Sequence, residues 1–145
     1  MKDDVFCSNS IKEGIIFETK YIMAVYDIAP VVEGHTLLIP KRHIFSFIEL
    51  NNKELNDLIK VMKAILPVLI KLYGDETNSY SILSQVGVSS GMSIPHLHLH
   101  ILPRKRSASN SNNPYYSIET SRIIKKDEYL REVKRLRKEL NYKII

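Results

Sequence analysis

The order of apolar and polar positions along this chain predicts short strands on either side of one long helix. Short runs that are apolar throughout or alternate in polarity have the length and composition of β-strands. A tight turn at Thr19-Lys20 joins the first two, and Pro40 is expected to end the third because proline has no N–H for a ladder. The predicted strands are residues 15–18, 21–26, 34–39, 79–86 and 96–102.

The strongest helical pattern covers residues 51–73. Asn51 is a suitable N-cap and Glu54 stands three residues later, as in a capping box. Pro67 is expected to kink this helix and Gly74 to end it. A second helix is predicted over 127–141. The apolar positions at helical spacing in the first helix are Leu55, Leu58, Ile59, Met62, Ile65, Leu66 and Leu69.

Strands followed by one helix and then more strands indicate an α+β domain with an antiparallel sheet. With 145 residues, the chain is long enough for one domain with a real core. Residues 107–113 contain only Ser, Ala and Asn, and we expect a mobile loop there.

Composition narrows the class of protein. No apolar run is long enough to cross a bilayer, and the first residues lack the pattern of a signal peptide. The single Cys7 excludes an internal disulfide, so we expect a cytoplasmic protein with no membrane partner. The net charge of +5 suits an anionic ligand. Much of the excess lies between Arg104 and Lys143, which we interpret as a solvated surface in preference to a nucleic-acid footprint.

The candidate chemistry is concentrated in three histidines that alternate with leucine. On a strand, His96, His98 and His100 would share one face, backed by an apolar stripe on the other. A neutral imidazole nitrogen can attack phosphorus, provided that its second nitrogen is held as a donor. We expect the carbonyl of His100 to hold His98 in this way. The flanking rings, about 7 Å away along the strand, would reach the same phosphate: His96 at the leaving group and His100 at the non-bridging oxygens.

Two other interpretations of the histidines stay open. Alternating histidines can supply zinc ligands, but no acidic residue lies within the triplet or the seven residues before it. The remaining alternative is three unrelated histidines on a solvated strand. The preceding loop favours phosphate binding, because Gly87 and Gly91 permit close backbone approach and Gln85 and Ser93 offer neutral donors.

The triplet and its upstream glycines resemble the signature of the histidine triad (HIT) family of nucleotidyl hydrolases and transferases. The segments 26–30 and 34–44 are similar to the N-terminal half of that family, and the resemblance covers about residues 5–104. It implies a single HIT domain over 1–145, with a five-stranded antiparallel sheet, one long helix, and a C-terminal extension over 105–145 that ends in a helix.

The resemblance also implies a role for each matching residue. His98 corresponds to the nucleophile, and His96, His100 and His35 to the other catalytic histidines. Asp27 corresponds to an acceptor for the ribose hydroxyls. Gln85 and Ser93 match phosphate-contacting positions, and the base would be walled by Phe6, Ile22 and Leu37.

The chain departs from the family pattern at two places. Met92 replaces a residue that is often Gln or Glu, which puts one polar contact in doubt. Some relatives hold a structural zinc through Cys-x-x-Cys and two histidines, but here only the second cysteine, Cys7, is present. We expect no zinc, although His43 and His96 remain available as ligands and Asp4 is a substitute in principle.

The function implied is cleavage at the α-phosphate of a purine nucleotide through a covalent nucleotidyl-histidine intermediate. The segment 85–105 is most similar to the Fhit-type branch, which cleaves dinucleoside polyphosphates, and less to the Hint-type phosphoramidases. Arg104 and Lys105 would meet distal phosphates or remain surface charges. No metal is required to activate the nucleophile, a divalent cation would accompany a polyphosphate, and a homodimer is implied. The alternatives are a nucleotide-binding regulatory protein with vestigial catalysis and an aprataxin-type enzyme acting on nucleic-acid ends.

Overall fold

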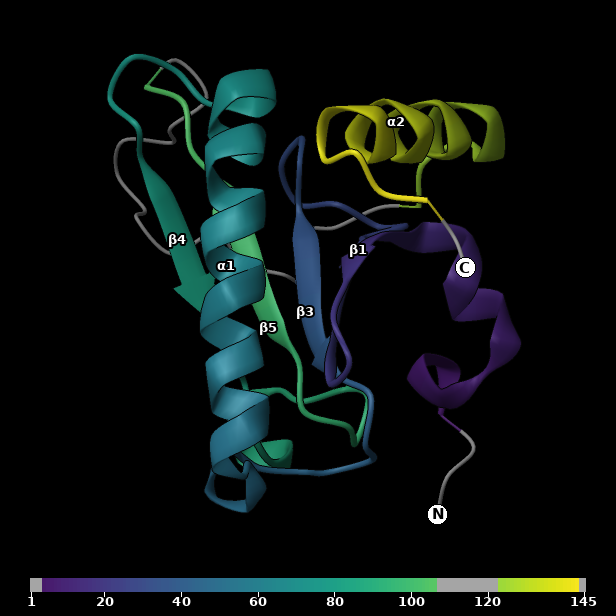
Figure 1. Cartoon of the computed structure of the whole chain (residues 1–145), viewed down its shortest axis with the longest axis vertical. Helices are drawn as coiled ribbons and strands as arrows, with labels where there is room; N and C mark the ends of the chain where they lie inside the picture. The colour runs from purple at the N-terminus through teal and green to yellow at the C-terminus, as the bar shows by residue number, and fades with distance from the viewer. Residues whose placement is uncertain (1–3, 107–122, 144–145) are drawn as a thin grey trace.

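The computed structural model describes residues 4–106 and 123–143, and its centre is an antiparallel five-stranded sheet with the strand order β1-β2-β3-β5-β4 (Figure 1). The predicted α+β architecture is confirmed. The strands are β1 (Ile15–Glu18), β2 (Ile22–Tyr26), β3 (Thr36–Pro40), β4 (Tyr80–Leu83) and β5 (Leu99–Pro103).

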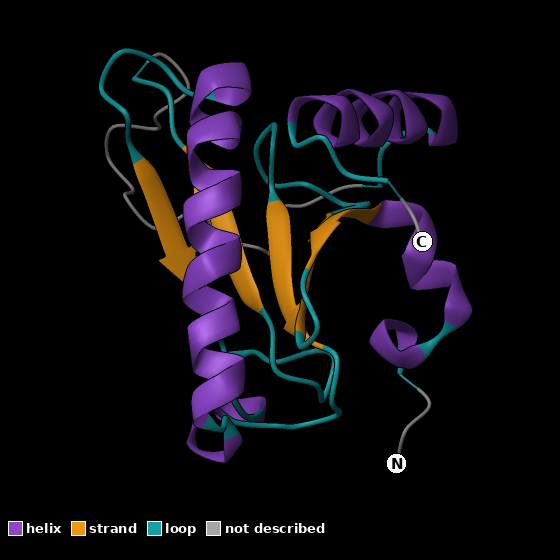
Figure 2. Cartoon of the chain, in the orientation of Figure 1, coloured by secondary structure: helices purple, strands orange, loops and turns teal. Residues whose placement is uncertain are grey.

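The long helix α1 (Asn52–Tyr73) packs along one face of the sheet (Figure 2). Its start is the predicted capping box: the Asn51 side chain accepts from the Glu54 N–H at 2.9 Å, and the Glu54 carboxylate accepts from the Asn51 N–H at 3.0 Å. The helix runs through Pro67 to Gly74 without a break. The predicted apolar stripe is only partly buried, because Leu55 and Ile59 are exposed. The residues that face the sheet are Leu58, Val61, Ile65 and Leu69.

The second helix, α2 (Lys126–Glu139), begins one residue before the predicted range of 127–141 and ends two residues before its end, and it joins the same core as α1. Tyr129, Val133 and Leu136 are buried there, and the Tyr129 hydroxyl donates to the carbonyl of Tyr26 at 3.1 Å. The expected loop at 107–113 lies outside the described residues. Within 4–106 and 123–143, neither helix is long and apolar enough to cross a membrane.

The opposite face of the sheet carries a smaller apolar cluster under the N-terminal 3-10 turns. These turns are η1 (Val5–Cys7) and η2 (Asn9–Gly14). Phe6 packs there with Met23, Val25 and Leu37. Short 3-10 turns, and neither α1 nor α2, cover this face. It is therefore the face on which side chains of β5 can meet a ligand.

The triplet enters the sheet later than the sequence predicts, because β5 begins at Leu99 and not at His96. Its partner strand β3 ends at Pro40, and the Leu97 N–H donates instead to the carbonyl of Ile44 at 2.7 Å. β4 is also shorter than predicted, since it ends at Leu83 opposite His100. Only His100 therefore lies within a strand, and the strict alternation expected for the three rings does not apply to His96.

Candidate active site

His98 is a buried, neutral imidazole whose ring is oriented by the backbone of its own segment. Its Nδ1 donates to the carbonyl of His96 at 2.7 Å, so the expected carbonyl of His100 is not the partner. Burial lowers the pKa of His98, while the bond to His96 and the Asp27 and Asp4 carboxylates oppose that shift. Because the proton is held on Nδ1, Nε2 is the bare nitrogen that can act as a nucleophile.

The three rings do not stand apart as the strand spacing predicts. The His98 and His100 ring centroids are 5.0 Å apart in an edge-on arrangement. The expected separation of about 7 Å assumed regular strand geometry on both sides of Leu99. The departure from strand geometry before Leu99 brings the two rings into contact, so both can touch one phosphoryl group.

His100 is oriented by His35, the fourth histidine that the resemblance singled out. His35 Nδ1 accepts from the N–H of Val31 at 3.2 Å, so the proton of His35 is on Nε2, which donates to His100 Nδ1 at 2.9 Å. His100 must then carry its own proton on Nε2. Burial lowers the pKa of each ring to about 3, which keeps both neutral. His100 therefore presents an N–H donor.

Asp27 lies beside this pair. One carboxylate oxygen is 3.4 Å from His35 Nε2, and the other accepts from the N–H of Ala29 at 2.8 Å. Burial raises the pKa of Asp27. The carboxylate is thus held at the edge of the histidine group, at the end of β2, where it can accept hydrogen bonds from a ligand.

His96 does not face the phosphate position, which contradicts its expected role at the leaving group. Its ring is fully buried, Nε2 lies 2.7 Å from the carbonyl of Pro40, and Nδ1 points into a group of N-terminal side chains. Because both nitrogens are engaged, His96 is a positioning residue whose carbonyl orients His98. The spacing of the histidines did not predict this orientation, because the predicted strand began at His96 whereas β5 begins at Leu99.

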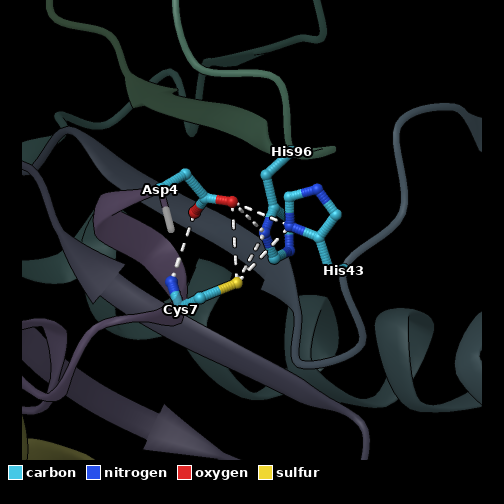
Figure 3. A group of neighbouring side chains, drawn as sticks. All are labelled: Asp4, Cys7, His43 and His96. Atoms are coloured by element: carbon cyan, nitrogen blue, oxygen red, sulfur yellow. Dashed lines mark hydrogen bonds and ion pairs between the residues drawn. The ribbon is translucent and has the colours of Figure 1, made fainter. Parts of the chain in front are cut away.

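The group that surrounds His96 Nδ1 consists of Asp4, Cys7, His43 and His96, and we call it the N-terminal cluster (Figure 3). One ligand atom from each residue lies within 4.8 Å of the others. Although the sequence places no acidic residue near the triplet, folding brings Asp4 to it from the other end of the chain. The donor set of one carboxylate, one thiol and two imidazoles fits a tetrahedral metal ion.

The residues expected to wall the base divide between the two faces of the sheet. Phe6 meets the His98 ring edge-on, with the centroids 5.1 Å apart, and Leu37 stands opposite His100 in the ladder, so both lie on the histidine face. Ile22 is fully buried in the core under α1, on the other face. Its expected place in the base wall is therefore wrong. Val25 of the same strand packs instead in the cluster that holds Phe6 and Leu37.

A cavity of about 450 Å³ is lined in part by Phe6. The N-terminal turns, β1, β2 and the C-terminal Tyr142 form its walls. Its lining combines apolar side chains with Lys12 and with Lys41, which is paired with Glu18 at 2.5 Å. The lining residues also include Cys7, Ser8, Asn9, Ile11, Ile15, Glu18 and Met23.

The loop before the triplet contains two glycines in a backbone conformation that side chains rarely adopt. Gly87 and Gly91 both have positive φ, and the amide of Gln85 lies over Gly91 where a Cβ would come within 3.0 Å of its Nε2. Ser93 is exposed on the segment that leads to His96. A residue that the sequence analysis missed, Ser84, donates from its hydroxyl to the carbonyl of His98 at 2.9 Å and ties this loop to the segment that carries His98.

Comparison with known proteins places this geometry in a family. A family model described as HIT domain matches residues 8–107. The bis(5'-nucleosyl)-tetraphosphatase [asymmetrical] of Schizosaccharomyces pombe is 32% identical over 103 residues, which is 71% of this chain. The chain spans only 56% of that relative's length.

Two further comparisons cover almost the whole chain. An uncharacterized HIT-like protein of Methanocaldococcus jannaschii is 32% identical over 133 residues, 90% of this chain and 98% of its own. The crystal structure of a HIT-like protein of Bartonella henselae, described as involved in cell-cycle regulation, has a TM-score of 0.73 and 25% identity. It covers 95% of this chain and 97% of its own. The fold around the histidines is therefore shared by proteins of similar length.

Proposed function

We propose that this chain, which belongs to the HIT domain family, hydrolyses nucleotides at the α-phosphate through a nucleotidyl intermediate on His98. The observation that carries the proposal is the pair of fixed tautomers. His98 has its proton on Nδ1 and a bare Nε2, and the neighbouring His100 has its proton on Nε2. One nitrogen can attack phosphorus while the other donates to a phosphoryl oxygen.

In the first step, His98 Nε2 attacks the α-phosphorus of the bound nucleotide. A P–N bond forms as the P–O bond to the leaving phosphate breaks, and the leaving group keeps the electron pair as an anion. The N–H of His100 lies next to the developing charge on the non-bridging oxygens. Donors that are already oriented in a buried site stabilise such charge without reorganisation.

In the second step, water attacks the same phosphorus and the P–N bond breaks. The products are a nucleoside monophosphate, free His98 and a proton released to solvent. The hydrogen bond from His98 Nδ1 to the carbonyl of His96 stabilises the intermediate, because the ring carries positive charge while its Nε2 is bonded to phosphorus.

The substrates that we propose are dinucleoside polyphosphates, with nucleoside phosphoramidates as the second class. The S. pombe relative is a tetraphosphatase by name, which supports the first class. Phe6, Val25 and Leu37 offer apolar contacts for a purine on the histidine face. Asp27 would accept from the ribose, and Gln85 and Ser93 would donate to phosphate oxygens.

The N-terminal cluster has a donor set that fits the structural zinc that the resemblance implies for some relatives. Asp4, Cys7, His43 and His96 would hold it. Bound there, the ion would cross-link the N-terminal turn and the segment that carries His96.

The direct experiment is single-turnover trapping with a diadenosine polyphosphate labelled at the α-phosphorus. We expect the wild-type chain to form an acid-labile, base-stable protein adduct. His98→Ala should form no adduct and show no turnover, yet bind AMP with an affinity close to wild type. Normal turnover by His98→Ala would overturn the mechanism. Ser79→Ala, on a loop outside the site, is the matched control.

A further inference from the structure

We propose that the C-terminal helix α2 positions the candidate active site, and that Tyr129 and Glu132 are the positioning residues, which act on the loop between β2 and β3. This loop, residues 27–35, carries Asp27 at one end and His35 at the other. The effect of α2 on nucleotide binding rests on the proposed function, whereas its effect on the histidine rings does not. The helix lies beyond the residues that match the family model, across the end of the sheet where β3 begins (Figure 1).

Tyr26 is the residue through which α2 reaches both ends of this loop. It directly precedes Asp27, and its hydroxyl accepts a hydrogen bond at 3.4 Å from the N–H of Gly34, which directly precedes His35. The two ends are also joined to each other, because the Asp27 N–H donates to the carbonyl of His35 at 2.9 Å. A displacement of Tyr26 would therefore move both Asp27 and His35.

Tyr129 on α2 holds the backbone of Tyr26. Its hydroxyl donates to the Tyr26 carbonyl at 3.1 Å, and the two rings pack with their centroids 5.9 Å apart. Both tyrosines are buried, so solvent does not replace this hydrogen bond when the hydroxyl is removed. The end of β2, and with it the start of the loop, is thus fixed by a side chain 103 residues later in the chain.

Gly14 leaves the space that the Tyr129 hydroxyl occupies. A Cβ on Gly14 would lie 2.0 Å from this hydroxyl oxygen. The φ angle of Gly14 is not positive, so the backbone conformation does not by itself require glycine at this position. Further along α2, Arg137 donates to the carbonyls of Glu13 and Ile15, at 3.1 and 2.7 Å, and so anchors the helix on both sides of Gly14. The missing side chain at residue 14 therefore lets Tyr129 reach the sheet.

Glu132 holds the other end of the loop through Tyr73 of α1. The Tyr73 hydroxyl donates to Glu132 Oε1 at 2.7 Å, and the Tyr73 ring stacks on Tyr26 with 6.4 Å between the centroids. The same ring fills the space beside Gly34, where a Cβ would come within 2.5 Å of it. The backbone that leads into His35 is therefore packed against a side chain that α2 orients.

A third contact lies just before α2, where the N–H of Ile124 donates to the carbonyl of Ile28 at 3.1 Å. The C-terminal segment thus meets the loop at three points. Because the N–H of Val31 in this loop sets the tautomer of His35, at 3.2 Å, a displaced loop would also disturb the hydrogen bond from His35 to His100. Misplacement of a catalytic group by about 1 Å can lower a rate about 100-fold.

The effect on the rings is tested by proton–nitrogen correlation spectra of the histidine side chains in the full chain without nucleotide. We expect Tyr129→Phe, which removes only a hydroxyl, to shift the ring nitrogens of His35 and His100 and to leave those of His43 in the N-terminal cluster unchanged. Lys134→Ala, at an exposed position of the same helix, is the matched control and should shift none of them. Unchanged His35 and His100 spectra in Tyr129→Phe would overturn the positioning of the histidines.

The effect on binding is tested by calorimetric titration with AMP and with dideoxy-AMP, which lacks the ribose hydroxyls proposed to contact Asp27. We expect the wild-type chain to bind AMP at least about 10-fold more tightly, and Tyr129→Phe to reduce this preference at least about 3-fold. Glu132→Gln, whose amide oxygen can still accept from Tyr73, should keep the preference, whereas Glu132→Ala should lose part of it. A merely structural role would lower stability and leave the ratio of affinities unchanged, and that result would overturn the positioning of Asp27.

The contact at Gly14 is tested by a double-mutant cycle. Gly14→Ala should lower the midpoint of urea unfolding more in the wild-type chain than in the Tyr129→Phe background, where the hydroxyl no longer occupies the space of the added methyl group. In the wild-type background, Gly14→Ala should also reduce the preference for AMP, because it displaces Tyr129. Equal losses of stability in the two backgrounds would overturn the contact on which the positioning depends.

The two proposals can fail separately. If the wild-type chain binds neither nucleotide, the proposed function is overturned, and the histidine spectra decide whether α2 positions the rings. If the wild-type chain prefers AMP but Tyr129→Phe keeps both the preference and the spectra, the proposed function stands and the positioning by α2 is overturned.

Discussion

His35 Nε2 lies 2.9 Å from His100 Nδ1, and this contact sets the proton on the opposite nitrogen of His100. The chain of donors starts at the backbone N–H of Val31, passes through both rings and ends at His100 Nε2. The backbone N–H of Val31, in the loop between β2 and β3, thus orients the ring that is proposed to donate to the phosphate.

Loss of His35 should impair catalysis more than binding. In His35→Ala, His100 loses the donor that fixes its tautomer, and we expect kcat to fall about 10–100-fold with a smaller change in KM. His35→Gln, whose amide can donate to His100 Nδ1, should recover part of kcat. Steady-state kinetics on diadenosine triphosphate would measure both. A merely structural role would predict equal losses in the two variants at equal stability.

Truncation of His100 should remove one donor to the phosphoryl oxygens. We expect His100→Ala to lower kcat about 10²–10³-fold, the usual effect of removing one such donor. His43→Ala is the comparison, because that histidine lies in the N-terminal cluster and not at the phosphate position. Single-turnover rates with saturating enzyme would measure the chemical step. An undiminished rate in His100→Ala would contradict the donor role.

The protein should lose stability as the pH falls below neutrality. The folded-state pKa of both His35 and His100 is about 3, whereas unfolded histidine titrates near 6.5. Below pH 6.5 the unfolded chain therefore binds more protons, and each histidine lowers the free energy of unfolding by about 2 kcal/mol at pH 5 relative to pH 8. Urea unfolding at the two pH values would measure this. His35→Gln should show a smaller difference between them, and an unchanged difference would contradict the assignment.

Two glycines with similar φ angles should respond differently to alanine. Gly34 has φ +86°, and a Cβ there would come within 2.5 Å of the Tyr73 ring, whereas Gly87 has φ +90° and no atom within 4 Å of its Cβ position. Gly87→Ala should cost only the backbone strain, about 1 kcal/mol. Gly34→Ala adds overpacking and should cost about 2–4 kcal/mol. Thermal unfolding of both variants would show whether Gly34 is the more sensitive position.

Removal of Glu54 should destabilise the start of α1. This buried carboxylate caps Asn51 and also receives two hydrogen bonds from Arg42, at 2.8 and 3.0 Å, which hold its pKa below the usual value. We expect Glu54→Ala to cost about 2–3 kcal/mol, from the lost cap and the lost charged hydrogen bonds. Glu139→Ala, which removes the exposed pair with Lys71, should cost less than about 1 kcal/mol. Equal losses of stability in the two variants would contradict the contribution of these buried hydrogen bonds.

Local sequence determined much of the fold, because its signals depend on neighbouring residues. The cap at Asn51, the end of α1 at Gly74 and the antiparallel α+β architecture all follow from periodicity, caps and turn residues. The proposed nucleophile, His98, is also prominent in the sequence, since three alternating histidines with a glycine-containing loop and a matching upstream segment are a specific pattern.

Tertiary structure alone decided what each histidine does. Because β3 ends at Pro40, His96 leaves the strand, turns away from His98 and meets Asp4 and Cys7 from the opposite end of the chain. The position of Ile22 under α1 depended in the same way on which face of β2 meets the helix. Sequence determines which residue types are available and their local periodicity. Long-range packing decides the direction of each ring and its partners, and these set the tautomers on which the chemistry depends.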